Sequence, residues 1–93
     1  MSSIVVYSSS ATSSLKIKKD IEGTKRLLDS KQLAYEERDM AQLDKADRDQ
    51  VYEVAGTRTI PLVFVDGRYV GDYDELQYRE ETETLDAILR GQF

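Results

Sequence analysis

The chain has 93 residues and a formal net charge of −5, from 18 acidic and 13 basic side chains, and it contains neither cysteine nor histidine. This length predicts one domain, residues 1–93, with one compact core. The composition excludes thiolate nucleophiles, disulfides and thiolate metal sites, and it lacks the commonest general base. The negative net charge disfavours nucleic acid as a partner, because phosphate backbones repel it.

No run of about 18 apolar residues is present, so we expect no membrane-spanning helix. The chain as given also lacks a basic region followed by a long apolar run, so we expect no secretory signal. A cysteine-free chain fits a reducing compartment, which predicts a cytoplasmic protein. The carboxylates Glu80, Glu81 and Glu83 could be read as a metal site, but such charge runs usually form a solvated helix face. We therefore predict no metal and no cofactor.

The N-terminal third predicts a strand, a polar loop and a helix. Residues 4–7 (IVVY) are apolar on both faces, which is typical of a central strand. Residues 8–14 are all Ser, Thr or Ala, and Ser13 and Ser14 can cap the helix that follows. That helix should span residues 15–29, with an inward stripe of Ile17, Ile21, Thr24 and Leu28.

Gly23 lies inside this predicted helix, where glycine costs about 1 kcal/mol relative to alanine. Close packing against the sheet would explain it.

The middle of the chain predicts a second strand over residues 33–38, with Leu33 and Tyr35 on one face. Residues 39–44 then lead into a second helix that stops at Gly56. The apolar face of this helix is weak and comprises Leu43, Ala46, Gln50, Val51 and Val54.

The last third predicts a hairpin and a broken helical region. Asp66-Gly67 separates two apolar runs, and a two-residue turn of this kind needs positive φ angles. Pro61 is the only proline and stands at the start of its strand, where a missing N–H does least harm. Helical residues follow Gly71 to Asp74, and the polar interval at residues 80–83 predicts a kink or two shorter helices.

The element order is therefore β-α-β-α-β-β-α. A strand–helix–strand start implies a right-handed crossover between two parallel strands, and the later hairpin adds antiparallel neighbours. We predict an α/β fold with a four-stranded mixed sheet and helices on both faces, a three-layer sandwich.

That order, together with Thr59-Ile60-Pro61, Asp66-Gly67 and Gly71-Asp72-Tyr73-Asp74, resembles the glutaredoxin branch of the thioredoxin-like fold. Within this branch the chain is most similar to the small SH3-domain-binding glutamic-acid-rich-like proteins, which generally lack the catalytic cysteine pair. Val6-Tyr7-Ser8 with its Ser/Thr loop, Ala55-Gly56 and Gly71-Asp72-Tyr73 carry this closer match, and Thr84-Leu85 adds to it. The resemblance covers nearly the whole chain.

One property of that family does not transfer to this chain. Some relatives carry a proline-rich segment around the cis-proline, whereas this chain has only Pro61. A polyproline-type ligand needs at least two spaced prolines, so SH3 binding is not expected. The glutamate-rich tail of the founding member is absent too.

The resemblance implies a groove with three walls. Thr12 falls where glutaredoxins place the nucleophilic cysteine, Leu15 falls near the second cysteine, and Ser13 lies between them. A hydroxyl without a histidine cannot replace a thiolate, so the Ser/Thr loop either caps the helix or offers an anion or peptide docking site. Ile60-Pro61, with the proline in cis, would form the second wall, with Arg58 and Thr59 before it. Alternatively, Pro61 simply ends one connection and starts the strand.

The third wall would be Gly71, Asp72, Tyr73 and Asp74, which correspond to the loop that holds the γ-glutamyl end of glutathione. Here Tyr73 would meet the carboxylate and Asp74 the ammonium group. Asp72 replaces a glycine and adds negative charge, and Ser9 stands where a lysine usually meets the glycyl carboxylate. Arg58 could substitute for that lysine or lie on the surface. The resemblance therefore allows at most weak glutathione binding.

Three hypotheses follow, all non-enzymatic. The first is a protein-interaction module, an adaptor or regulator, that holds a peptide or protein partner in this groove. The second is a redox-inactive glutathione-binding accessory protein. The third is a structural subunit in which the groove has lost its use.

Overall fold

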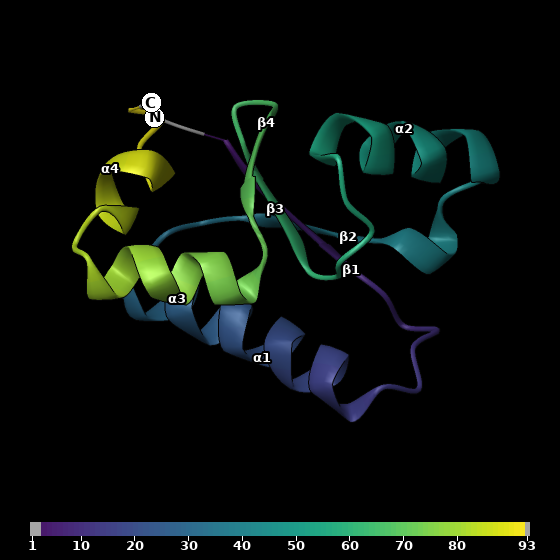
Figure 1. Ribbon diagram of the computed structural model, residues 1–93, viewed down its shortest axis with the longest axis horizontal. Helices are drawn as coiled ribbons and strands as arrows, with labels where there is room; N and C mark the ends of the chain where they lie inside the picture. The colour runs from purple at the N-terminus through teal and green to yellow at the C-terminus, as the bar shows by residue number, and fades with distance from the viewer. Residues whose placement is uncertain (1–2, 93) are drawn as a thin grey trace.

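The computed structural model describes residues 3–92 and contains one four-stranded sheet in the order β2-β1-β3-β4 (Figure 1). β1 pairs with β2 in parallel, and the β1–β3 and β3–β4 pairs are antiparallel. In chain order the elements are β1 (Ile4–Ser8), α1 (Leu15–Ser30), β2 (Glu36–Asp39), the 3-10 turn η1 (Met40–Gln42), α2 (Lys45–Ala55), β3 (Leu62–Val65), β4 (Arg68–Gly71), α3 (Tyr73–Glu81) and α4 (Leu85–Leu89). The predicted mixed sheet is confirmed, and so is the division of the last helical region into two.

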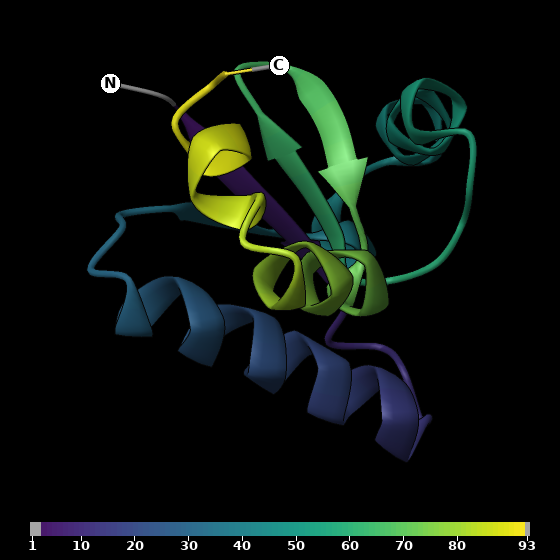
Figure 2. The same cartoon turned by 60° about the vertical axis from the view of Figure 1, so that its left-hand side comes forward.

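Helices lie on both faces of the sheet, as predicted. α1, α3 and α4 cover one face and α2 covers the other (Figure 1, Figure 2). Alternate side chains of β1 and β3 point to opposite faces, so each face has its own core. The first core joins Ile4, Val6, Val63 and Val65 to Leu28, Leu76, Leu85 and Leu89. The second joins Tyr7, Leu62 and Phe64 to Ile21, Met40 and Ile60.

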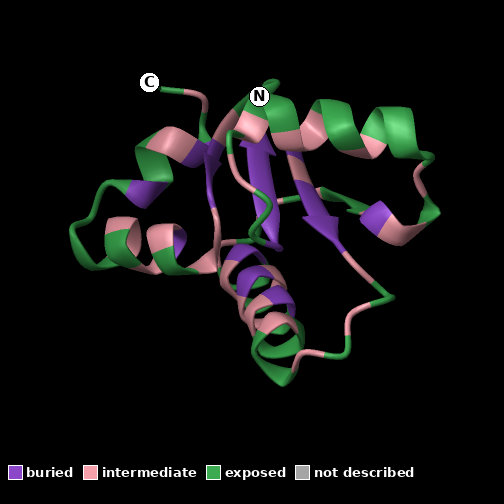
Figure 3. Ribbon diagram, turned by 45° about the vertical axis from the view of Figure 1, so that its right-hand side comes forward, coloured by how far each residue is buried: buried purple, intermediate pink, exposed green. Residues whose placement is uncertain are grey.

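β1 and β3 are the central strands and the most deeply buried elements (Figure 3). Val6, Leu62, Val63 and Val65 have no exposed surface. Residues 4–7 therefore behave as the central strand that their two-sided apolar pattern predicted. Among the residues described, no helix is both long and apolar enough to cross a membrane.

Local turn and cap signals are confirmed. Asp66 and Gly67 have φ angles of 52° and 83°, as a two-residue hairpin requires. Gly56 ends α2 in the left-handed conformation at φ 72°. The Ile60–Pro61 peptide bond is cis, as the family resemblance implied.

Two predicted segments are corrected. β2 begins at Glu36 and ends at Asp39, three residues later than its predicted start, because its parallel register with β1 pairs Val5 with Glu36 and Ser8 with Asp39. Leu33 and Tyr35 still pack against the first core from outside the ladder.

In α2, the side chains against the sheet are Val51, Tyr52 and Ala55. Leu43 and Val51 of the predicted face do pack against the second core. Val54 is 52% exposed, and Ala46 and Gln50 are exposed, because the helix is rotated toward Tyr52 and Ala55.

Candidate functional site

The three segments of the predicted groove leave the sheet at one end. The ladder pairs Tyr7 with Leu62 and Val63 with Gly71. Three segments therefore lie at the same end of the strands: the Ser/Thr loop after β1, Ile60-Pro61 before β3 and Asp72 after β4. β2 also ends there, because Ser8 pairs with Asp39.

The hydroxyl groups of the Ser/Thr loop are partly used to build the start of α1. Ser14 is the N-cap, and its Oγ accepts a hydrogen bond from the Ile17 N–H at 3.3 Å. Thr12 lies two residues ahead of the cap, and its Oγ1 accepts from the Ser14 N–H at 3.2 Å. Ser13 is exposed and does not cap the helix. The capping interpretation thus holds for Ser14. It occupies the Ile17 N–H and leaves the N–H groups of Leu15 and Lys16 without an acceptor inside the helix.

Within the described part of the chain, the segment before β3 has backbone groups without an internal hydrogen bond. The side chains of Ile60 and Pro61 are buried. Between residues 3 and 92, the hydrogen bonds outside the regular elements include none that uses the Ile60 N–H or C=O. Thr59 donates its N–H to Thr57 Oγ1 at 3.3 Å. The Arg58 guanidinium lies over the Tyr52 ring, 5.0 Å from its centroid, and is therefore directed toward α2.

The Gly71–Asp74 segment starts α3. Asp72 is the N-cap, and its Oδ1 accepts from the Glu75 N–H at 2.9 Å. The Tyr73 ring packs against α1 and its hydroxyl accepts from Gln77 Nε2 at 2.5 Å. Asp74 is exposed, and its carboxylate lies 3.9 Å from Lys16 Nζ. Asp72, which the resemblance predicts to weaken glutathione binding, therefore has a structural role as the N-cap of α3.

Four of the ten predicted groove residues line the surface hollows described here, and they fall in three different ones. Gly71 and Asp72 line one hollow of about 410 Å³ with Tyr69, Glu75 and Arg79, among others. Tyr73 lines another of about 470 Å³ on the outer side of α1. Arg58 lines a third, of about 270 Å³, beside α2.

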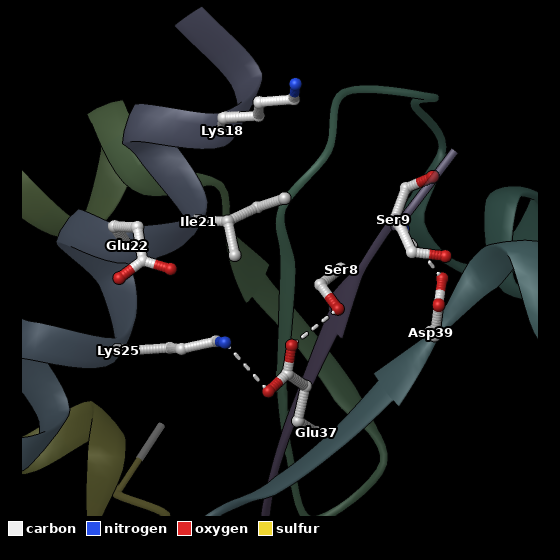
Figure 4. A pocket seen from close by; sticks show the side chains of 9 residues that line it. Ser8, Ser9, Lys18, Ile21, Glu22, Lys25, Glu37 and Asp39 are labelled. Atoms are coloured by element: carbon white, nitrogen blue, oxygen red, sulfur yellow. Dashed lines mark hydrogen bonds and ion pairs between the residues drawn. The ribbon is translucent and has the colours of Figure 1, made fainter. Parts of the chain in front are cut away.

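A further hollow, of about 490 Å³, contains none of the predicted residues. It lies between α1 and the carboxyl ends of the two parallel strands (Figure 4), and its lining is Ser8, Ser9, Ser10, Lys18, Ile21, Glu22, Lys25, Glu37 and Asp39. The sequence did contain a signal for this position, because ligands of open α/β sheets bind beyond the carboxyl ends of parallel strands.

Glu37 is the polar centre of this hollow. It accepts hydrogen bonds from Ser8 Oγ at 2.7 Å and Lys25 Nζ at 2.9 Å (Figure 4). Burial alone would raise the pKa of the Glu37 carboxyl, but the bonds from Lys25 and Ser8 outweigh burial and lower it. Hydrogen bonds from the Ser10 side chain and N–H similarly lower the pKa of Asp39. Of the five charged side chains that line the hollow, only Lys25 and Glu37 pair with one another, and Asp39 is held by Ser10.

A family model described as SH3-binding, glutamic acid-rich protein matches residues 2–92. The chain belongs to this family. It is also 33% identical over 69 residues to Glutaredoxin 1 of Rickettsia felis and of Rickettsia conorii, a region covering 73% of this chain and 68% of each relative. The relationship suggested by the sequence is therefore confirmed.

Solved structures confirm the thioredoxin-like, glutaredoxin-type fold. A buckwheat glutaredoxin–glutathione complex superposes with a TM-score of 0.76 at 22% identity, covering 98% of this chain and 79% of that one. The C. albicans actin interacting protein Aip5 superposes with a TM-score of 0.79 at 19% identity, covering 95% and 88%. This member of the family has no cysteine, so it has no thiol with which to carry out glutaredoxin chemistry.

Proposed function

We propose that this chain is a non-catalytic interaction module, an adaptor or regulator, that holds an extended segment of a protein partner. The binding groove would be formed by Thr12, Ser13, residues 58–61 and residues 71–74. We expect it to act in the cytoplasm, because a cysteine-free chain fits a reducing compartment.

The unpaired backbone of Ile60 carries this proposal. The N–H and C=O groups of Ile60 have no hydrogen-bond partner among residues 3–92. Backbone polar groups need a partner, which here is either water or a bound segment. An extended peptide can satisfy both groups by pairing as an additional strand does. The first turn of α3 supports the same site, because the N–H of Tyr73 has no acceptor within its own helix.

A partner cross-link tests the groove. A photoreactive amino acid in place of Thr12 should couple to the partner in an extract of the source cells, because Thr12 lies in the loop at the groove's edge. The same group in place of Val54, which is exposed on α2 on the opposite face of the sheet, is the control. Mass spectrometry identifies the products. A partner coupled equally from both positions, or from Val54 alone, would place the interaction elsewhere.

Glutathione binding without redox chemistry is the second candidate. A glutaredoxin that superposes on this chain was solved as a glutathione complex. The family resemblance implies that Ile60, Gly71 and Tyr73 correspond to its glutathione-binding positions. Asp72 and Ser9 oppose tight binding, because the first adds a negative charge near the ligand carboxylate and the second removes a cation.

Amide NMR spectra with added reduced glutathione separate the two candidates. We expect no saturable shifts at Ile60, Gly71 and Tyr73 up to cellular concentrations, because electrostatic repulsion from Asp72 disfavours the γ-glutamyl carboxylate. Saturable shifts confined to these three amides would favour the second candidate. The Asp72→Ser variant, which keeps an N-cap oxygen but removes the charge, should then bind glutathione more tightly than the wild type.

A further inference from the structure

α1 differs in charge from the remainder of the molecule. Its 16 residues contain five basic and three acidic side chains, a net charge of +2. Because the whole chain has a net charge of −5, the remainder carries −7. Such a separation produces a local positive potential on a protein that is negative overall.

Three of these basic side chains are not used inside the molecule. Lys16 pairs with Asp20 at 2.6 Å and Lys25 pairs with Glu37 at 2.9 Å. By contrast, Lys18, Lys19 and Arg26 form no ion pair with any residue between 3 and 92, and all three are exposed. Their charge is available to a partner.

The three cations border the 470 Å³ hollow on the outer side of α1. Its remaining lining is Leu15, Asp20, Glu22, Gly23 and Tyr73. Asp20 is neutralised by Lys16, which leaves Glu22 as the only unpaired acid in this lining. Tyr73, at the start of α3, is the one residue of this lining from another element, and the ribbon in Figure 2 shows α1 at the outside of the molecule.

Apolar surface accompanies the charge. Leu15 is 70% exposed at one end of the hollow, and the half-buried Tyr73 ring lies over Gly23 at its centre. Lys19 and Arg26 are seven residues apart, which is two helical turns or about 10 Å. That distance equals about three residues of a segment in the polyproline II conformation, which has three residues per turn, so side chains three residues apart lie on the same side.

We propose that the outer face of α1 docks an acidic segment of another protein. Two carboxylates of that segment, about three residues apart, pair with Lys19 and Arg26. Lys18 adds to the positive electrostatic potential. An apolar side chain of the segment covers Leu15 beside Tyr73. This surface shares Tyr73 with the groove described above but does not include the Ile60 backbone, so shifts at Lys19 and Arg26 without a shift at Ile60 distinguish the two sites.

NMR titration of the full chain with a synthetic peptide, Ser-Leu-Glu-Glu-Ser-Glu-Glu-Ser, tests the proposal at low ionic strength. Saturable amide shifts are expected at Leu15, Lys19, Gly23, Arg26 and Tyr73. The Lys19→Glu/Arg26→Glu variant should bind at least about tenfold more weakly, a loss of about 1.4 kcal/mol. Leu15→Ser should also weaken binding, with little effect on folding because the side chain is exposed. Added salt should weaken the complex.

Lys45→Glu/Arg90→Glu is the matched control, because it makes the same change in net charge on exposed positions of α2 and beside α4. It should retain the wild-type affinity within about twofold. Equal loss in both double variants would overturn the proposal, as would equal binding of a peptide with lysine in place of glutamate. Shifts that lie only outside α1 and Tyr73 would also overturn it. Sedimentation that shows a dimer broken by Lys19→Glu/Arg26→Glu would assign the surface to a second copy instead.

Discussion

Two glycines have side-chain neighbours that explain them. A Cβ atom on Gly23 would lie 2.6 Å from Cε1 of Tyr73, so this glycine makes room for an aromatic ring of α3. The predicted contact with the sheet is wrong, because Gly23 lies on the side of α1 that faces α3. Gly71 has φ 145°, and a Cβ there would lie 2.6 Å from Cγ of Glu75. Glycine is therefore required at position 71 for two reasons: the positive φ angle and the lack of space for a Cβ atom beside Glu75.

Gly71→Ala should lower the free energy of unfolding by about 3 kcal/mol, from backbone strain and from overpacking against Glu75. The Glu75 Cβ and Cγ atoms lie too near their own backbone to swing away. Urea denaturation measures the loss. Gly67→Ala is the control, since Gly67 also has positive φ, 83°, but nothing within 4 Å of a Cβ. It should cost about 1 kcal/mol, and equal costs at the two positions would contradict this account.

At the scale of the element, α1 starts at a specific hydroxyl. Ser14 caps the helix, while the neighbouring Ser13 is exposed and does not. The composition of the loop allowed either serine to serve, because both are good N-cap residues.

Ser14→Ala should lower the free energy of unfolding by about 1 kcal/mol, because the Ile17 N–H loses its acceptor. Ser13→Ala, the same change one residue earlier, should stay within about 0.5 kcal/mol of the wild type. Thermal and urea unfolding of the two variants measure the difference. A larger loss for Ser13→Ala would mean that Ser13, and not Ser14, caps α1.

Lys31 joins the end of α1 to α3 and α4. Its Nζ lies 2.9 Å from Glu80 and 2.6 Å from Asp86, and its side chain is only 17% exposed. Hydrogen bonds to Asp86 and then Glu80 raise the pKa of Lys31. Glu80, read from the sequence as part of a solvated run, is thus partly engaged in fixing the helical layer.

Lys31→Gln should lower the free energy of unfolding by about 1 kcal/mol, because two carboxylates lose a half-buried partner. Lys45→Gln is the control, since its pair with Asp49 is highly exposed and exposed pairs contribute little. Urea denaturation at low and high salt should show a salt-dependent loss for Lys31→Gln only. An equal effect in both variants would mean that burial does not strengthen the Lys31 pairs.

At the scale of the whole molecule, paired carboxylates determine how stability depends on pH. The pKa values of Glu37, Asp39 and Asp86 lie below their ordinary range in the folded chain. A lowered pKa means that the unfolded chain binds protons more readily than the folded one. The resulting stability is complete above the ordinary carboxyl pKa of about 4 and is lost as the pH falls through the lower folded values.

The free energy of unfolding should therefore fall as the pH is lowered below about 4. Urea denaturation over a series of pH values measures this slope. Glu37→Gln should show a shallower slope in acid than the wild type, because one of the coupled groups is removed. An unchanged slope would mean that the pKa of Glu37 is the same in the folded and unfolded chain.

The sequence by itself determined the order of the elements, the hairpin at Asp66-Gly67, the stop at Gly56 and the absence of thiol chemistry. Each of these depends on local turn chemistry, hydrophobic periodicity or residue type, all of which are readable within a few residues. It also indicated the family, because the motifs that carry the resemblance are contiguous. The proposed groove residues were named in the same way, and their role stays a prediction.

Only the tertiary structure decided where β2 begins, which face of α2 packs on the sheet, and why α1 contains Gly23. Each depends on a segment distant in sequence: the β1 register for β2, the second core for α2, and Tyr73 for Gly23. The hollow around Glu37 and the unpaired cations of α1 were likewise decided only by the tertiary structure. Whether a charged side chain is paired or available depends on what folding places opposite it, and local sequence does not contain that information.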